Sequence, residues 1–235
     1  SDLTVAILDT NRQGLDETAR GHARIHPYVC DVADQNAVES VLADIRQRHG
    51  AIDRLTHAAA IMPMGRLNDL SSAQIVRQMH INYDGTVFLT KAVLPEMLQR
   101  QTGEIIIFGS LTGYLPSPLM AAYSASKAAT NMYAHQLIRE NANSGVRIAL
   151  VCPPAVNTPL IEQHQPHKTG GFIELCRKTG LIIEPGFVLD QIERDLGKGK
   201  AVIFPGMLAR SANLVHRLAP ELTWRALSLI DKAGY

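Results

Sequence analysis

Two short apolar runs on either side of a long stretch without glycine or proline constrain the fold of this chain most. The runs are 104–108 and 146–152, and the stretch between them is 121–143. A short, nearly continuous apolar run is typical of a strand buried on both faces of a parallel sheet. Strand, helix and strand in this order form a βαβ unit. We therefore predict an α/β fold, a doubly wound parallel sheet of the Rossmann type with three layers.

Other stretches extend this alternation of strands and helices. Residues 4–9 predict a strand that ends at Asp9, which also suits the cap of a helix running through Leu15. Further helices are expected after Asp34 and Ser71, which are good N-cap residues, and from Pro185, because proline suits a first helical turn.

Composition excludes several classes of protein. The chain has 235 residues, of which 46% are hydrophobic, enough for one domain with a large core. Lys plus Arg number 23 against 22 for Asp plus Glu, so no charge bias points to nucleic acid or an anionic membrane. No apolar run approaches the roughly 20 residues that span a bilayer. The three cysteines lack C-x-x-C spacing, which favours reduced thiols and a cytoplasmic location.

A hydroxyl, a phenol and an ammonium are predicted to meet at one edge of the sheet. Ser110 follows the first apolar run, and Tyr123 and Lys127 are four residues apart on the helix, hence on one face. A cation about 4 Å from the phenol would favour phenolate by up to roughly 4 kcal/mol. We therefore expect Lys127 to bring the pKa of Tyr123 close to neutrality, so that Tyr123 exchanges protons with a substrate.

With these motifs the chain resembles the short-chain dehydrogenase/reductase family. That family combines a Ser, Tyr-x-x-x-Lys and a strand ending in Pro-Gly-x-Val-x-Thr, which is matched here except that Pro154 replaces the glycine. Asn82 resembles the family's Asn on the long helix before the catalytic strand. The resemblance runs from about Leu3 to Phe204.

The resemblance implies a role for each matching residue. Ser110 would bind the substrate oxygen, Tyr123 would exchange its proton, Lys127 would also hold the nicotinamide ribose, and Asn82 would hold a water in the proton relay. The residues implied in cofactor binding are Asp9, Asp31, Val32, Ala59, Tyr123, Lys127, Pro153, Val156 and Thr158.

Two departures from the family pattern stand out. No Thr-Gly-x-x-x-Gly-x-Gly turn precedes Asp9, so the first β-α unit with its phosphate loop is expected to be missing, which would leave a gap in the sheet. His57, Ala58, Ala59 and Ala60 stand where the family has Asn-Asn-Ala-Gly. We interpret His57 as a partly buried histidine that hydrogen-bonds to backbone, in preference to a catalytic one.

Asp9 favours NAD(H) over NADP(H), because a carboxylate at the end of this strand accepts hydrogen bonds from ribose hydroxyls and repels a 2′-phosphate. Arg12 lies close by and could reach such a phosphate, so NADP(H) stays possible.

Residues 1–206 are predicted to form the Rossmann-type domain, with a substrate lid at about 159–184, and 207–235 a helical extension. His164 and His167 in the lid are expected to lie in an exposed loop, with no metal site. Apolar side chains suggest a hydrophobic alcohol or ketone, with plain packing as the equal alternative; they are Met62, Met64, Phe172, Ile173 and Leu175.

The predicted function is oxidoreduction of a secondary alcohol and a ketone with NAD(P). The alternative is a non-catalytic dinucleotide-binding or scaffold protein, which the absent phosphate loop, Ala58 and Pro154 favour and the intact set Asn82, Ser110, Tyr123 and Lys127 disfavours. A serine hydrolase is excluded because Phe108 stands at the first position of G-x-S-x-G. Resemblance suggests a homodimer or homotetramer formed through the helices that carry Asn82 and Tyr123.

Overall fold

The computed structural model describes residues 3–163, 176–177 and 182–232 of the chain. Most of the expected lid therefore lies outside the described residues. This applies to the predictions for His164, His167, Phe172, Ile173 and Leu175.

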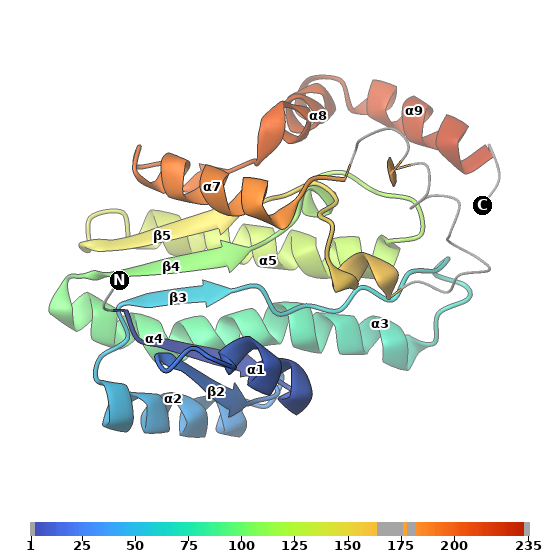
Figure 1. Cartoon of the computed structure of the whole chain (residues 1–235). Helices are drawn as coiled ribbons and strands as arrows, with labels where there is room; N and C mark the ends of the chain where they lie inside the picture. Colours follow the sequence, from blue (N-terminus) through green and yellow to red (C-terminus); the bar gives the residue numbers. More distant parts are fainter. Residues whose placement is uncertain (1–2, 164–175, 178–181, 233–235) are drawn as a thin grey trace.

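The described strands form two parallel sheets (Figure 1). Their order is β1-β2 in one sheet and β3-β4-β5-β6 in the other, and all the pairs are parallel. No ladder joins β1 to β3 among the described strands, in line with the expected gap. The strands are β1 (Val5–Asp9), β2 (Ile25–Val29), β3 (Arg54–His57), β4 (Gly103–Phe108), β5 (Val146–Val151) and β6 (Val202–Ile203).

Helices cover both faces of the four-stranded sheet, which confirms the predicted three-layer α/β class (Figure 1). Side chains alternate along β4, so that Ile105 and Ile107 pack with α2, α4 and α5, while Ile106 packs with α7. The helices are α1 (Arg12–Ala19), α2 (Gln35–His49), α3 (Ser72–Met79), α4 (Gly85–Arg100), α5 (Ala121–Glu140), α7 (Pro185–Leu196), α8 (Gly206–Leu218) and α9 (Pro220–Lys232).

The helix starts follow their capping residues with one correction. Asp34 caps α2, Ser71 caps α3 within a capping box, and Pro185 opens α7, as predicted. The cap of α1, however, is Asn11, whose side chain accepts from the Gly14 amide. Asp9 lies two residues too early to cap α1, and its carboxylate instead accepts from the Asn11 amide at 2.8 Å.

A π-helical turn, His80–Asp84, links α3 to α4 and contains Asn82. Such wider turns recur at functional sites. The next residue, Gly85, packs against Val32, because a Cβ at Gly85 would come within 2.8 Å of the Val32 side chain. The segment after β2 and the start of α4 are thus in direct contact.

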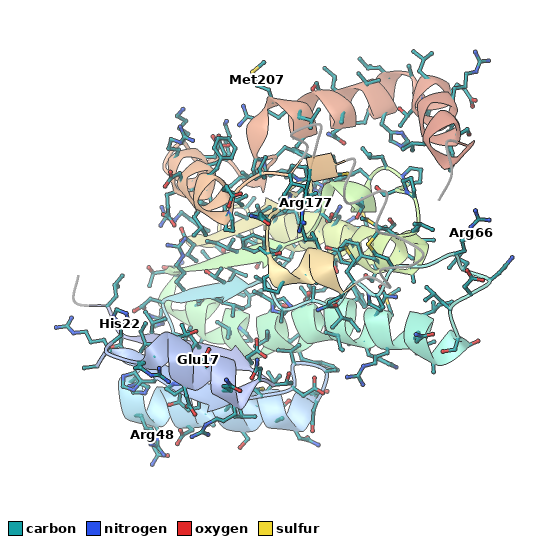
Figure 2. All side chains as sticks on the ribbon, turned by 45° about the vertical axis from the view of Figure 1, so that its right-hand side comes forward. Glu17, His22, Arg48, Arg66, Arg177 and Met207 are labelled. Carbon is teal, nitrogen blue, oxygen red and sulfur yellow. The ribbon has the colours of Figure 1, made fainter. Side chains whose placement is uncertain are left out.

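Helices α8 and α9 lie along the upper side of the molecule in Figure 1. The predicted helical extension consists of these two helices among the described residues, and the second starts at Pro220 with Glu221 in its first turn. Met207, near the start of α8, projects away from the body (Figure 2). Of the helices that the structure describes, none is long and apolar enough to cross a membrane.

Candidate active site

Ser110, Tyr123 and Lys127 meet where the parallel strands end. Ser110 is the second residue after β4, and Tyr123 and Lys127 lie on the first turns of α5. The Lys127 ammonium donates to the Phe108 carbonyl at 2.7 Å and lies 5.8 Å from the centroid of the Tyr123 ring. All three side chains are buried. This edge is where open α/β folds bind ligands.

Burial dominates the proton affinities of this site. It raises the pKa of Tyr123 to about 12, although interaction with the nearby Ser110 hydroxyl lowers it. Burial also lowers the pKa of Lys127 to about 8, because the ammonium is removed from water. The sequence predicted that Lys127 would bring the pKa of Tyr123 close to neutrality. In the protein by itself the pKa of Tyr123 is raised instead, because desolvation of the phenol is the largest influence on it.

Asn131 positions Ser110, a role that the sequence reasoning missed. Its amide donates to the Ser110 carbonyl at 3.0 Å, and its oxygen accepts from the Ser110 amide at 3.3 Å. The signal was available, since Tyr123, Lys127 and Asn131 recur at steps of four residues and share one face of α5. The space is tight, because a Cβ at Gly109 would lie 2.0 Å from the Asn131 oxygen.

Asn82 joins the π-helical turn to the loop after β3 and to α5. Its side chain exchanges two hydrogen bonds with the backbone of Ile61, at 2.8 and 3.0 Å, and donates to the Ser126 hydroxyl at 2.9 Å. The backbone carbonyl of Asn82 accepts hydrogen bonds from the hydroxyls of Thr86 at 2.8 Å and Thr130 at 3.1 Å. A carbonyl has two lone pairs, so these contacts use its ordinary acceptor capacity. The expected water relay through Asn82 stays a prediction.

His57 ends β3 and is 4% exposed. Its Nε2 has no hydrogen-bond partner among the described residues, which corrects the expectation of a histidine satisfied by backbone. Burial, and secondarily the positive charge of Lys127, lowers the pKa of His57 to about 3. The imidazole is therefore neutral at physiological pH.

A sulfur-containing apolar cluster surrounds Tyr123. Met62 and Met64, which the sequence indicated as apolar contacts, are buried in the same cluster as Met120 and Ile161. The Met62 amide donates to the Gln163 side chain at 2.9 Å, which ties the loop after β3 to the start of the expected lid. The surroundings of the Tyr123 phenol are thus largely apolar.

The residues expected at the adenosine end of a cofactor lie at the ends of the first strands. Asp9 is the last residue of β1, and Asp31 follows β2, where its carboxylate accepts from the Ala33 amide at 2.9 Å. The Arg12 guanidinium forms an ion pair with Asp16 at 3.1 Å. Among the described residues it forms no ion pair with Asp9. Ala59, after β3, is exposed.

At the other end, the segment after β5 holds the residues expected near nicotinamide. The Pro153 carbonyl accepts from the Leu111 amide at 3.1 Å, which joins the ends of β4 and β5 behind Ser110. Val156 forms an isolated parallel bridge with Ile183, and Thr158 precedes the short 3₁₀ turn Pro159–Glu162.

These residues fit a dinucleotide. The Lys127 ammonium is buried and has three N–H donors. In the described structure one of them bonds to the Phe108 carbonyl, so two can bind ribose hydroxyls. The Asp9 carboxylate is exposed at the sheet edge. In the described structure its Oδ1 accepts hydrogen bonds from the Thr10 hydroxyl and the Asn11 amide. In the described part of the chain, no group of three or more metal-ligating side chains is found.

Comparison with known proteins connects this site to an enzyme family. A family model described as short chain dehydrogenase matches residues 1–169. The chain is 37% identical to "Oxidoreductase UcpA" of Salmonella typhimurium over 144 residues, 61% of this chain and 54% of that protein. It is 31% identical to "Dehydrogenase/reductase SDR family member 7B" of Rattus norvegicus over 199 residues, 84% of this chain and 61% of that protein. The chain thus spans little more than half the length of these curated relatives.

Solved structures share the fold. A short-chain dehydrogenase from Streptomyces avermitilis superposes with a TM-score of 0.82 at 22% identity, covering 99% of this chain and 90% of that one. A gluconate 5-dehydrogenase from Burkholderia cenocepacia, in complex with NADP and tartrate, superposes with a TM-score of 0.62 at 27% identity, covering 67% and 63%. An NAD+-bound xylitol dehydrogenase gives 0.62 at 26% identity, covering 67% and 63%.

Proposed function

This chain belongs to the short-chain dehydrogenase family, and from that premise we propose that it interconverts a secondary alcohol and a ketone with a nicotinamide cofactor. The observation that carries the proposal is the meeting of Ser110, Tyr123 and Lys127, all buried, at the carboxyl edge of a parallel sheet. A hydroxyl donor, a phenol and a buried ammonium can together bind a carbonyl oxygen and supply its proton as the carbonyl is reduced to an alcohol.

In ketone reduction, Ser110 donates a hydrogen bond to the substrate oxygen, and Tyr123 gives that oxygen its proton. Tyr123 suits this step because its raised pKa keeps the phenol protonated at neutral pH. Alcohol oxidation reverses these transfers, and Tyr123 then takes the hydroxyl proton as phenolate. When bound, the nicotinamide would supply the hydride for reduction and accept it in oxidation, and its oxidised ring would add a positive charge that lowers the pKa of Tyr123. Asn131 and Asn82 keep Ser110 and the first turns of α5 in place.

Lys127 would hold the nicotinamide ribose with its two remaining donors, and Val156 and Thr158 would orient the carboxamide. At the adenosine end, Asp31 and Val32 would contact adenine, and the backbone at Ala59 would pass close to it. Pro153 would fix the segment beside nicotinamide through its bond with Leu111.

NAD(H) is the preferred cofactor in this proposal. The solved structures above include one with NADP and one with NAD+, so the shared fold accommodates either. The choice rests on Asp9, whose carboxylate repels a 2′-phosphate. The pairing of Arg12 with Asp16 supports it, because that guanidinium already has an anionic partner. The apolar cluster around Tyr123 favours a hydrophobic substrate.

Location and assembly complete the proposal. Cys30 and Cys152 are buried and form no disulfide among the described residues, which suits a reducing compartment, and we place the protein in the cytoplasm. We propose a homodimer or homotetramer that uses the long helices carrying Asn82 and Tyr123, and light scattering of the purified protein tests this.

A cofactor titration coupled to turnover tests the proposal. Fluorescence titration of NADH and NADPH is expected to give tighter binding of NADH, and NADH oxidation is expected with a panel of hydrophobic ketones. Failure of the protein to bind either nucleotide would overturn the proposal and favour a scaffold of the same fold.

A further inference from the structure

A cavity of about 460 Å³ opens beside the start of α5. Its described walls come from the loop 66–68, the loop 116–119 with Ala121 at the start of α5, and helix α9. This volume falls within the roughly 300–1,000 Å³ of small-molecule sites. None of the three residues of the proposed chemistry is among the described lining residues, but Ala121 is two residues before Tyr123 and Leu119 packs against the same apolar cluster as Tyr123.

The two loops of this cavity are joined to each other and to the catalytic helix. The Gly65 amide donates to the Leu119 carbonyl at 2.8 Å, which connects them directly. Leu119 has a φ of 60°, a left-handed conformation that is uncommon for a side chain of this kind. Such outliers gather at ligand-binding positions. Its neighbour Met120 is buried with Tyr123 in one apolar cluster.

Helix α9 supplies the third wall through Trp224, Leu227 and Ser228. Trp224 is the one tryptophan of the chain, is 52% exposed, and lines the cavity together with Pro116 and Pro118. An aromatic ring and aliphatic side chains around a concave surface favour an apolar ligand.

Arg66 is the one ionisable side chain among the described lining residues. It projects from the loop at the rim of the molecule (Figure 2). The Arg66 guanidinium forms no ion pair with another described residue. No Asp or Glu is among the described lining residues of the cavity. A guanidinium without a carboxylate partner binds anionic groups through parallel N–H donors.

We propose that this cavity binds an apolar chain that ends in an anionic group, such as a medium-chain carboxylate. The chain lies against Trp224, Leu227 and the two prolines, and the anionic end meets Arg66. This chemistry fits either the far end of the redox substrate or a separate amphiphile, and the experiment below distinguishes the two sources. Binding itself does not depend on the proposed redox function.

Trp224 provides the measurement, because its fluorescence reports on one cavity only. Decanoate, below its micelle concentration, is titrated into the full chain, with decanol as the neutral probe of equal length. A saturable change is expected, with decanoate binding more tightly than decanol by about tenfold, the effect of roughly 1.4 kcal/mol from a charge-assisted hydrogen bond. Arg66→Gln is expected to remove that difference while leaving decanol binding unchanged.

A matched pair of leucines on α9 tests the place of binding. Leu227→Ala should weaken binding of both probes, whereas Leu222→Ala should leave it unchanged, because Leu222 is exposed and is not among the lining residues. No saturable change in the wild type, or equal affinity of wild type and Arg66→Gln for decanoate, overturns the proposal.

Tyr123→Phe separates this proposal from the proposed function. The variant should bind decanoate like the wild type, because Tyr123 is not among the described lining residues. A wild-type protein that binds decanoate but turns over no ketone would support the cavity and contradict the redox proposal. With an active enzyme, competitive inhibition by decanoate assigns the cavity to the substrate's own end, and unchanged KM in its presence assigns it to a separate amphiphile.

Discussion

Asn131→Ala is expected to destabilise the protein and displace Ser110. The substitution removes both hydrogen bonds to the Ser110 backbone from a side chain that is 2% exposed. The Ser110 carbonyl keeps the Gly113 amide at 3.1 Å, but the Ser110 amide keeps only the Cys152 sulfur, which is a weak acceptor. An unsatisfied buried donor costs about 1–3 kcal/mol, and the second lost bond adds about 1 kcal/mol. We therefore expect the free energy of unfolding to fall by about 2–4 kcal/mol.

Chemical denaturation monitored by circular dichroism measures this loss, with Met132→Ala as the control. Met132 is the next residue of α5 and is 61% exposed, so its substitution should cost no more than about 0.5 kcal/mol. Because a displacement of about 1 Å can cost about 100-fold in rate, kcat of Asn131→Ala should fall more than NADH affinity. Equal stability of Asn131→Ala and Met132→Ala would refute this reasoning.

Three further predictions follow from local contacts. Gly109→Ala should be severely destabilising, because its Cβ would lie 2.0 Å from the Asn131 oxygen, and measured unfolding should show a smaller added cost in the Asn131→Ala background; additive costs would contradict this. His57 has a pKa of about 3 in the folded protein and about 6.5 when unfolded, so the unfolded state binds the proton more readily. The free energy of unfolding should therefore decline as pH falls below about 6.5, by about 3 kcal/mol at about pH 4. His57→Asn should flatten this decline in acid-unfolding curves, and parallel curves for the two proteins would exclude His57 as its cause. Asp9→Ser should weaken NADH binding and strengthen NADPH binding in fluorescence titrations, and an unchanged ratio of the two affinities would remove Asp9 from cofactor selection.

The sequence predicts well those features that depend on local pattern. Apolar runs located β4 and β5, and capping residues located α2 and α3, because both signals lie within a few consecutive residues. The spacing of Tyr123 and Lys127 placed both on one face of α5. The relative positions of Ser110 and this helix then followed from parallel strands ending at one edge.

Features that depend on burial or on distant contacts were missed. The raised pKa of Tyr123 results from desolvation by burial. The cluster that holds Tyr123 includes Met62 and Met64, which are distant in sequence, so spacing does not reveal this burial. The cap of α1 depends on where the backbone leaves β1, and Asn11 instead of Asp9 occupies that position. Asn131 is four residues after Lys127, a spacing that the sequence shows. Its role in positioning Ser110, however, depends on β4, which brings Ser110 next to it.

The most direct test of the central claim compares wild type with Tyr123→Phe in NADH-dependent reduction of hydrophobic ketones, with NADH affinity measured on the same samples. If Tyr123 is the proton donor, kcat falls by about 10²–10⁴-fold while the Kd for NADH stays within about twofold, because the phenol acts on the substrate oxygen. A variant that reduces ketones as fast as the wild type would contradict the role of Tyr123 and, with it, the proposed mechanism.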